Sequence, residues 1–361
     1  MRQRLNHVLF GVLLSAMLCG GAYPCTTFCI EHGGRVVFGK NYDWSADDGF
    51  VFVNKRNVHK TALAMVSAAD KRAEWTSKYG SVTFNQYGRE LPNGGMNEVG
   101  LVVEVMWLSD TEHAPFDDQP AINNLQWVQY QLDNFGTVDQ VLQEAVKLRI
   151  MNDSPAKIHY LVGDSLGNAA SFEVLGGKWV CHNGDTMPVK ALTNDTYASS
   201  VEAMKGYKGL GGDLPLPQGR DSLARFIRAS SMVKGYGPKN LAPPVQYAFS
   251  ILDNAAQGDQ TKWRIVYDLK ARHIHFKTLR APETREISLK GLDFSCSTPV
   301  LLMDMNEDVS GNATGLFQPY TPEANRALIG TSFGKIDFLG SFPPKQLDML
   351  ALYPDSTRCG D

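Results

Sequence analysis

The strongest constraint on the fold is the grouping of short β-prone segments into hairpins, while helical patterns come in pairs. A first hairpin is predicted from residues 26–30 and 35–38, because Gly33 and Gly34 between them form a turn. Residues 261–268 and 273–278 predict a second hairpin, in which apolar side chains alternate along the first strand. Hairpins join antiparallel neighbours, so the pattern favours an α+β fold with antiparallel sheets over a parallel βαβ sheet.

Other segments extend this pattern along most of the chain. Further strands are predicted at residues 101–107, 158–162, 170–175, 178–182 and 191–193. Helices are predicted at residues 123–135, 138–148, 221–233 and 244–252, the third capped by Asp221 or Ser222, and residues 205–220 are a loop rich in Gly and Pro. The tail from Ile287 mixes short apolar runs with prolines and gives no prediction.

Composition excludes several classes of protein. The chain has 361 residues, a net charge of −3 and 43% hydrophobic residues, which is the composition of a globular protein and not of a disordered or fibrous one. It contains no basic block, so a nucleic-acid partner is not expected.

The first residues have the pattern of a secretory signal peptide, residues 1–22. Arg2 and Arg4 precede an apolar run at residues 8–22, with Gly20 and Ala22 as the small residues before a cut. The run is shorter than the roughly 20 residues that span a bilayer, and no later run is apolar enough, so no membrane span is expected. We therefore predict an exported protein, periplasmic or secreted. A buried N-terminal helix and a lipid anchor are the alternatives, although neither early cysteine follows a lipobox.

Cysteine usage points to one thiol with a function. Once Cys19 leaves with the signal peptide, five cysteines remain: Cys25, Cys29, Cys181, Cys296 and Cys359. An odd number in an oxidising compartment predicts an unpaired thiol, and the other four are an even number with open connectivity. No Cys or His pair has metal-ligand spacing, so neither a metal nor another cofactor is expected.

Cys25 lies where processing of the N-terminus would give it a free α-amine, which can act as the catalytic base. If residues 23–24 are removed after a cut at Ala22, Cys25 gains a free α-amine. The pKa of an α-amine is about 7.7–8.0, so this group can take the thiol proton at neutral pH. Pro24 does not suit signal peptidase, so a second trimming step is implied. The mature chain is predicted to be a single domain, residues 25–361.

Five motifs in order resemble one known family. They are Cys25–Phe28 with Phe38–Trp44, Gly95–Leu101, Leu192–Asn194, Ser222–Arg228, and Thr261–Trp263 with Tyr267–Asp268. Together they resemble the choloylglycine hydrolase family, which includes penicillin V acylases and bile salt hydrolases. The resemblance implies a four-layer αββα N-terminal nucleophile (Ntn) hydrolase sandwich, and hydrolysis of linear amide C–N bonds.

The resemblance assigns roles to three residues near the N-terminus. Cys25 is the nucleophile, and Asp43 accepts a hydrogen bond that orients its α-amine. Lys40 stands where the family usually has arginine beside the thiolate, and it keeps the charge but not the planar fork. A turn residue is the alternative for Asp43, and a solvated surface lysine is the alternative for Lys40.

It also assigns roles to three residues later in the chain. The Asn194 side chain and the backbone N–H at Trp107 are the expected oxyanion donors, and Trp107 is also a pocket wall. Arg225 is expected near the nucleophile, and Arg228, three residues on, could face the same side. The alternatives are an Asx turn for Asn194, plain core for Trp107 and solvated arginines.

The resulting function hypothesis is an exported amidohydrolase that acts on a small-molecule N-acyl amide through a thioester. Penicillin V, bile-acid conjugates and N-acyl homoserine lactones are the candidate substrates. The alternatives are a catalytically impaired binding protein on the same scaffold and a papain-like cysteine–histidine hydrolase. A homo-oligomer is left open, but the segment between Asn194 and Arg225 is shorter than the resemblance to Gram-positive members implies, where a long loop locks a tetramer, so that assembly is not expected.

Overall fold

The computed structural model describes residues 24–63, 71–152 and 155–360. The predicted signal peptide and Tyr23 lie outside these residues. Within the described part, no helix combines the length and the apolar character needed to cross a membrane.

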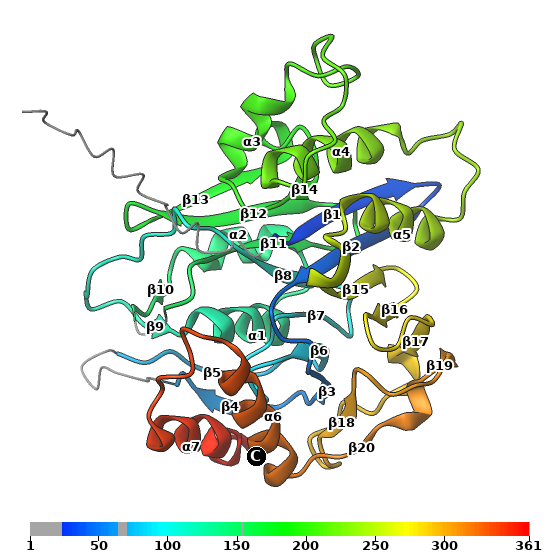
Figure 1. The fold of residues 1–361 in the computed structure, drawn as a ribbon. Coiled ribbons are helices and arrows are strands. Elements are labelled where there is room, and N and C mark those ends of the chain that lie inside the picture. Colours follow the sequence, from blue (N-terminus) through cyan, green and yellow to red (C-terminus); the bar gives the residue numbers. More distant parts are fainter. Residues whose placement is uncertain (1–23, 64–70, 153–154, 361) are drawn as a thin grey trace, which may run out of the picture.

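Two large sheets form the centre of the molecule (Figure 1). The seven-stranded sheet has the order β14 (Ala191–Leu192), β1 (Thr26–His32), β2 (Arg35–Asp43), β15 (Thr261–Asp268), β16 (His273–Thr278), β17 (Arg285–Ser288) and β19 (Gly311–Asn312). The nine-stranded sheet has the order β13 (Lys178–Asn183), β12 (Ala169–Leu175), β11 (Ile158–Gly163), β8 (Val102–Trp107), β7 (Gly94–Asn97), β6 (Ser81–Asn85), β3 (Phe50–Asn54), β18 (Leu301–Asp304) and β20 (Gln318–Pro319). Every pairing in the two is antiparallel except that of β17 with β19.

Helices cover the outer face of each sheet, which gives the four layers expected. Helices α3 (Tyr197–Met204), α4 (Ser222–Gly235) and α5 (Pro244–Ala255) pack on the seven-stranded sheet or on one another. Helices α1 (Asn124–Asn134) and α2 (Val138–Ala145) pack on the nine-stranded sheet. The predicted four-layer αββα sandwich with antiparallel sheets is therefore confirmed.

Side chains alternate between the two faces of a strand, so the nine-stranded sheet contributes apolar residues to two cores, one against the other sheet and one against its helices. Between the sheets, Phe84 of β6 contacts Tyr267 of β15 and Phe276 of β16, with ring centroids 6.2 and 5.4 Å apart. On the opposite face of the nine-stranded sheet, Trp127 of α1 packs on Tyr160 of β11 at 4.2 Å. Successive strand residues point to opposite faces, so one sheet serves both cores.

The local predictions succeed where the sequence pattern is strong. The second hairpin has the bounds predicted, and Asp221 caps α4 by accepting a bond from the Ala224 N–H at 2.9 Å. The helix predicted at residues 138–148 is wrong at its end, because α2 stops at Ala145 and the chain turns into β10. Strand β2 runs on to Asp43 because it is paired on both sides, with β1 and β15.

The tail that gave no prediction forms ordered structure. It contributes the end of β17, then β18 to β20, and then α6 (Pro322–Lys335) and α7 (Pro344–Leu352). Small sheets complete the fold, one of β21 (Arg358–Cys359), β4 (Val58–Thr61) and β5 (Glu74–Thr76), the other of β10 (Arg149–Ile150) and β9 (Ala121–Ile122). Single 3-10 turns lie at η1 (Gly184–Thr186), η2 (Gly258–Gln260), η3 (Leu289–Gly291), η4 (Thr314–Leu316) and η5 (Tyr353–Ser356).

Two of the four remaining cysteines are paired. Cys296 forms a disulfide with Cys359, 63 residues away in sequence, which ties the C-terminal strand to the body. Cys29 and Cys181 are unpaired thiols. Cys29 is 1% exposed on β1, so it fills the core.

Candidate active site

Cys25 lies immediately before β1 and is nearly buried, with 4% of its surface exposed. Pro24 precedes it in the structure, so its nitrogen is still a peptide nitrogen. Its Sγ lies 3.9 Å from the Asp43 carbonyl oxygen. Burial raises the pKa of the Cys25 thiol above its ordinary value, and the charge of Lys40 opposes that rise. Proton removal therefore needs a base close by.

Arg225 joins the cysteine to the predicted oxyanion residue. This α4 side chain is fully buried; its Nη1 donates to the Cys25 carbonyl oxygen and, at 2.8 Å, to Thr26 Oγ1. Its Nη2 donates to Asn194 Oδ1 at 2.8 Å. Burial lowers the pKa of Arg225 to about 10, so the guanidinium remains charged at neutral pH. The solvated-arginine alternative is wrong, since the side chain bridges two predicted site residues.

Asn194 is held by hydrogen bonds to two other elements, β8 and α4. Its side-chain Nδ2 donates to the Trp107 carbonyl oxygen on β8 at 2.9 Å, and its backbone N–H donates to Ser222 Oγ on α4 at 2.8 Å. The chain reaches this point because β14, two residues upstream, pairs with β1. The Asn194 side chain thus bonds to other elements, as a positioned functional group does.

Asp43 is the last residue of β2, and only one of its two carboxylate oxygens accepts a hydrogen bond from a described residue. One oxygen, Oδ1, accepts a hydrogen bond from the Thr261 hydroxyl. The other, Oδ2, is buried and accepts no hydrogen bond from any residue that the structure describes. Burial raises the pKa of Asp43 to about 6, against the opposing effects of the Thr261 bond and the Arg225 and Lys40 charges. Buried polar atoms are normally bonded, so this oxygen marks a place for a donor.

Lys40 is part of a buried polar network. It is 1% exposed, donates to the Val105 carbonyl oxygen and lies 3.9 Å from Glu104 Oε2. The Tyr267 hydroxyl donates to Glu104 Oε1 at 2.5 Å, and burial raises the pKa of Glu104 to about 7. The solvated-surface alternative for Lys40 is therefore wrong. Glu104 is not among the residues predicted from the sequence, although a lone acidic residue inside the apolar run 101–107 is a signal.

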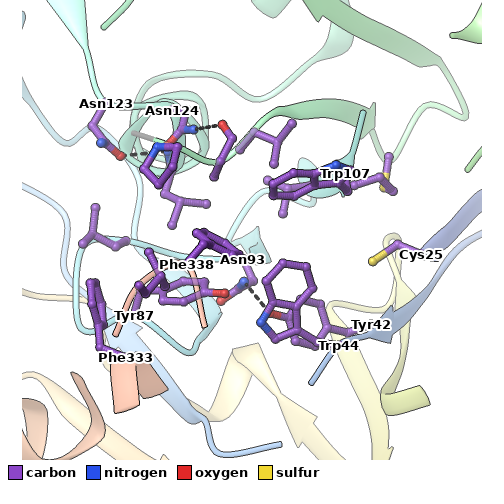
Figure 2. A pocket seen from close by; sticks show the side chains of 18 of the residues that line it. Cys25, Tyr42, Trp44, Tyr87, Asn93, Trp107, Asn123, Asn124, Phe333 and Phe338 are labelled. Atoms are coloured by element: carbon purple, nitrogen blue, oxygen red, sulfur yellow. Dashed lines mark hydrogen bonds between the residues drawn. The ribbon is translucent and has the colours of Figure 1, made fainter. Parts of the chain in front are cut away.

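An apolar pocket opens at Cys25 (Figure 2). Cys25 lies at one end, and Tyr87 and Phe333 lie well away from it. The pocket encloses about 820 Å³, open solvent at its mouth included. Its lining is Cys25, Tyr42, Trp44, Tyr87, Leu91, Asn93, Val105, Met106, Trp107, Asn123, Asn124, Leu125, Pro155, Ala156, Ile158, Phe333, Phe338, Leu339, Phe342 and Leu350. Trp107 thus lines the pocket in addition to contacting the core.

Arg228 does not join this cluster. Its guanidinium donates instead to Asn254 Oδ1 at 3.0 Å and to the Gly219 carbonyl oxygen at 2.6 Å. Arg228 therefore secures the loop before α4 and has no described contact with Cys25.

No histidine lines the pocket among the described residues. His159 is buried elsewhere, with its ring nitrogens 3.0 Å from Glu173 Oε1 and 2.8 Å from the Thr193 carbonyl oxygen. The described residues therefore place no histidine beside Cys25 in this pocket as a papain-like pair would require. The described residues that could hold a metal ion are His273, His275 and Glu286, and none of them lines the pocket.

Comparison with known proteins agrees with this geometry. The family model of linear amide C–N hydrolases, choloylglycine hydrolase family, matches residues 25–302. The chain belongs to this family. It is accordingly a hydrolase that acts on C–N bonds of linear amides, and the match begins at Cys25.

Individual relatives extend over most of the chain. A penicillin V acylase from Pectobacterium atrosepticum is 27% identical over 371 residues, 89% of this chain and 97% of that protein. The structure of penicillin V acylase from Agrobacterium tumefaciens has a TM-score of 0.71 and 28% identity, covering 82% of this chain and 98% of that one. A variant of the conjugated bile acid hydrolase from Clostridium perfringens has a TM-score of 0.65 at 19% identity, covering 79% and 98%, and supports the fold.

Proposed function

We propose that this protein is exported, loses residues 1–24, and hydrolyses small N-acyl amides with an apolar acyl group through a thioester on Cys25. One observation carries the proposal. Arg225 bonds both the Cys25 backbone and the Asn194 side chain, at the end of an apolar pocket. The nucleophile, a fixed cation and an amide donor are thereby held together at the place where an acyl group can bind.

The Asp43 carboxylate supports a mature N-terminal cysteine. Its buried Oδ2 accepts no bond from the described residues, and the Asp43 backbone contacts the Cys25 thiol. A freed α-amine at Cys25 would supply the missing donor. An amine with a pKa near 8 takes the thiol proton, whereas the peptide nitrogen present before trimming cannot.

The reaction then proceeds in two steps. The Cys25 sulfur attacks the amide carbon, the Asn194 amide stabilises the oxyanion, and the C–N bond breaks as the leaving amine receives the proton. Water, deprotonated by the same α-amine, then attacks the thioester and releases the carboxylic acid. The buried charges of Arg225 and Lys40 favour the thiolate, because an opposite charge nearby stabilises the ionised form.

The pocket favours an acyl group that is aromatic or aliphatic. Trp44 and Trp107 lie beside each other with ring centroids 6.1 Å apart, and Tyr42 stacks on Trp263 at 4.2 Å. The aromatic lining residues Tyr42, Trp44 and Trp107, with the two penicillin V acylase relatives, support penicillin V-type substrates over bile-acid conjugates. N-acyl homoserine lactones are the second candidate, since a flexible acyl chain also matches an apolar pocket.

The disulfide supports export. The Cys296–Cys359 pair is of the kind that persists in oxidising compartments and is rare in the cytosol. The signal-like residues 1–22 are consistent with the same route.

The test is to express the full chain with export, measure its intact mass, and follow amine release from penicillin V, glycine- and taurine-conjugated bile acids, and acyl homoserine lactones. We expect a mature chain that begins at Cys25 and hydrolyses penicillin V. Cys25→Ser should lose turnover, while Cys29→Ala, at an unpaired thiol on β1, should retain it. Full activity in a chain that keeps Tyr23 and Pro24 contradicts the mechanism. Binding of these amides without turnover by the wild type would favour the binding-protein alternative.

A further inference from the structure

The far wall of the pocket comes from the C-terminal tail. Five lining residues lie on α6, α7 or the turn between them, residues 336–343, and all are apolar: Phe333, Phe338, Leu339, Phe342 and Leu350. The family model ends its match at residue 302, so this wall lies outside the matched part of the chain. The catalytic cluster and the wall facing it are therefore separate parts of the sequence.

Phe338 connects this wall to the part of the pocket near Cys25. Its ring lies 6.3 Å from Trp44, edge to face, and 6.0 Å from Trp107. Trp44 follows Asp43 in sequence, and Trp107 carries the carbonyl that holds Asn194. Figure 2 shows Cys25 and Phe333 far apart, with Trp44 and Phe338 in the region between them. An acyl group bound to Cys25 that enters the pocket therefore meets Phe338 along its length.

Contacts at both ends hold this wall in place. At the start of α6, Asn325 Oδ1 accepts the Arg89 N–H at 2.8 Å, while its Nδ2 donates to the Ala351 carbonyl oxygen at 3.2 Å. At the end of α6, Lys335 pairs with Asp48. After α7, the Tyr353 hydroxyl donates to the Thr61 carbonyl oxygen at 2.8 Å. A wall fixed in this way selects by shape, because it does not yield freely to a longer ligand.

We propose that the α6–α7 turn, through Phe338 and Leu339, sets the length and bulk of the acyl group that this enzyme accepts. The inference rests on the proposed function, because it places the acyl group in the pocket at Cys25. In an apolar pocket one methylene changes kcat/KM about 10–200-fold. Removal of the Phe338 ring frees the space of several methylenes.

The decisive measurement is a chain-length profile. The 4-nitroanilides of straight-chain acids from two to twelve carbons, together with the phenoxyacetyl derivative, report kcat/KM through release of 4-nitroaniline. In Phe338→Ala we expect the optimum to move to longer chains, and the ratio of kcat/KM for twelve against four carbons to rise at least tenfold. Phe338→Trp should move the optimum to shorter chains.

Leu352→Ala is the matched control, because it shortens an apolar side chain on α7 that is 56% exposed and outside the pocket lining. It should leave the profile unchanged. The proposal is overturned if Phe338→Ala, with an unfolding temperature like that of the wild type, lowers kcat/KM by one common factor at every length. It is also overturned if Leu352→Ala changes the profile in the same way.

A binding measurement separates this inference from the proposed function. In the Cys25→Ser background, the free straight-chain acids are titrated with tryptophan fluorescence as the readout, with and without Phe338→Ala. If the wild type cleaves no anilide and no penicillin V, the proposed function fails. A shift in the chain-length preference of binding would still support the proposal that the α6–α7 turn sets the length of the bound acyl group. If Cys25→Ser binds the acids with the same chain-length preference with and without Phe338→Ala, the proposed role of Phe338 is refuted, whatever the activity of the wild type.

Discussion

Arg225 offers the sharpest test of the catalytic geometry. Its guanidinium bonds the Cys25 carbonyl oxygen through one nitrogen and Asn194 Oδ1 through the other, at 2.8 Å. In Arg225→Lys the positive charge remains, but a single ammonium lacks the planar fork that spans these two acceptors. The substitution therefore separates the charge of Arg225 from its placement of Asn194.

The size of the effect follows from that contact. A hydrogen bond to a charged group contributes about 1.5–3 kcal/mol. If the lost bond acts fully in the transition state, kcat falls about 10–150-fold. Asn194→Ala removes the oxyanion donor itself and should cost about 10²–10³ in kcat. Because Arg225 acts partly through Asn194, the double variant should lose less than the product of the two single losses.

The assay is amine release from penicillin V under saturating and limiting substrate, with circular dichroism to show that each variant is folded. Arg228→Lys is the control, since Arg228 lies one turn further along α4 and binds Asn254 and Gly219 instead of the site. It should stay within about threefold of the wild type. A kcat for Arg225→Lys within threefold of the wild type, or strictly multiplicative losses in the double variant, would refute the reasoning.

Three further predictions concern stability. The fold raises the pKa of Glu104 from 4.5 to about 7, so between these pH values the folded chain binds more protons than the unfolded chain, and the free energy of unfolding falls as pH rises. In Glu104→Gln, urea titrations at pH 5 and pH 8 should show a smaller fall. The same difference in unfolding free energy between the two pH values in variant and wild type contradicts this prediction. Lys60→Met leaves the carboxylates of Glu90 and Asp133, now 2.6 and 2.9 Å from Lys60 Nζ, buried without that cation, and should cost about 3–5 kcal/mol in urea unfolding, whereas exposed Lys147→Met should cost little. Cys359→Ser should cost about 2–4 kcal/mol, and a reductant should have no further effect on that variant.

The elements with strong local patterns were predictable. Thr261–Asp268 alternates apolar and polar residues and is followed by a turn, and that pattern requires no knowledge of distant contacts. The end of α2 was not predictable, because the following residues join β10, which pairs with a strand 28 residues upstream. The tail after Ile287 was unreadable for the same reason, since its short strands are defined by partners such as β3.

The residues of the candidate site likewise divide into those that the sequence predicted and those that only the structure reveals. Cys25 could be named from its position after the predicted signal peptide, and Asp43, Asn194 and Arg225 because the motifs that contain them resemble those of the choloylglycine hydrolase family. For Glu104 the sequence offers only an acidic residue inside an apolar run, and its contacts with Lys40 and Tyr267 on other strands could not be predicted.

The sequence alone determined the antiparallel α+β pattern and the family, because alternation, turns and ordered motifs are local properties of the chain. Only the tertiary structure decided which of those residues meet. Arg225 and Cys25 are 200 residues apart, and they touch because α4 packs on β1. Tertiary contacts of the α6–α7 turn likewise bring Phe338 to Trp44 and Trp107, so the pocket opposite the nucleophile is a product of contacts that no local pattern encodes.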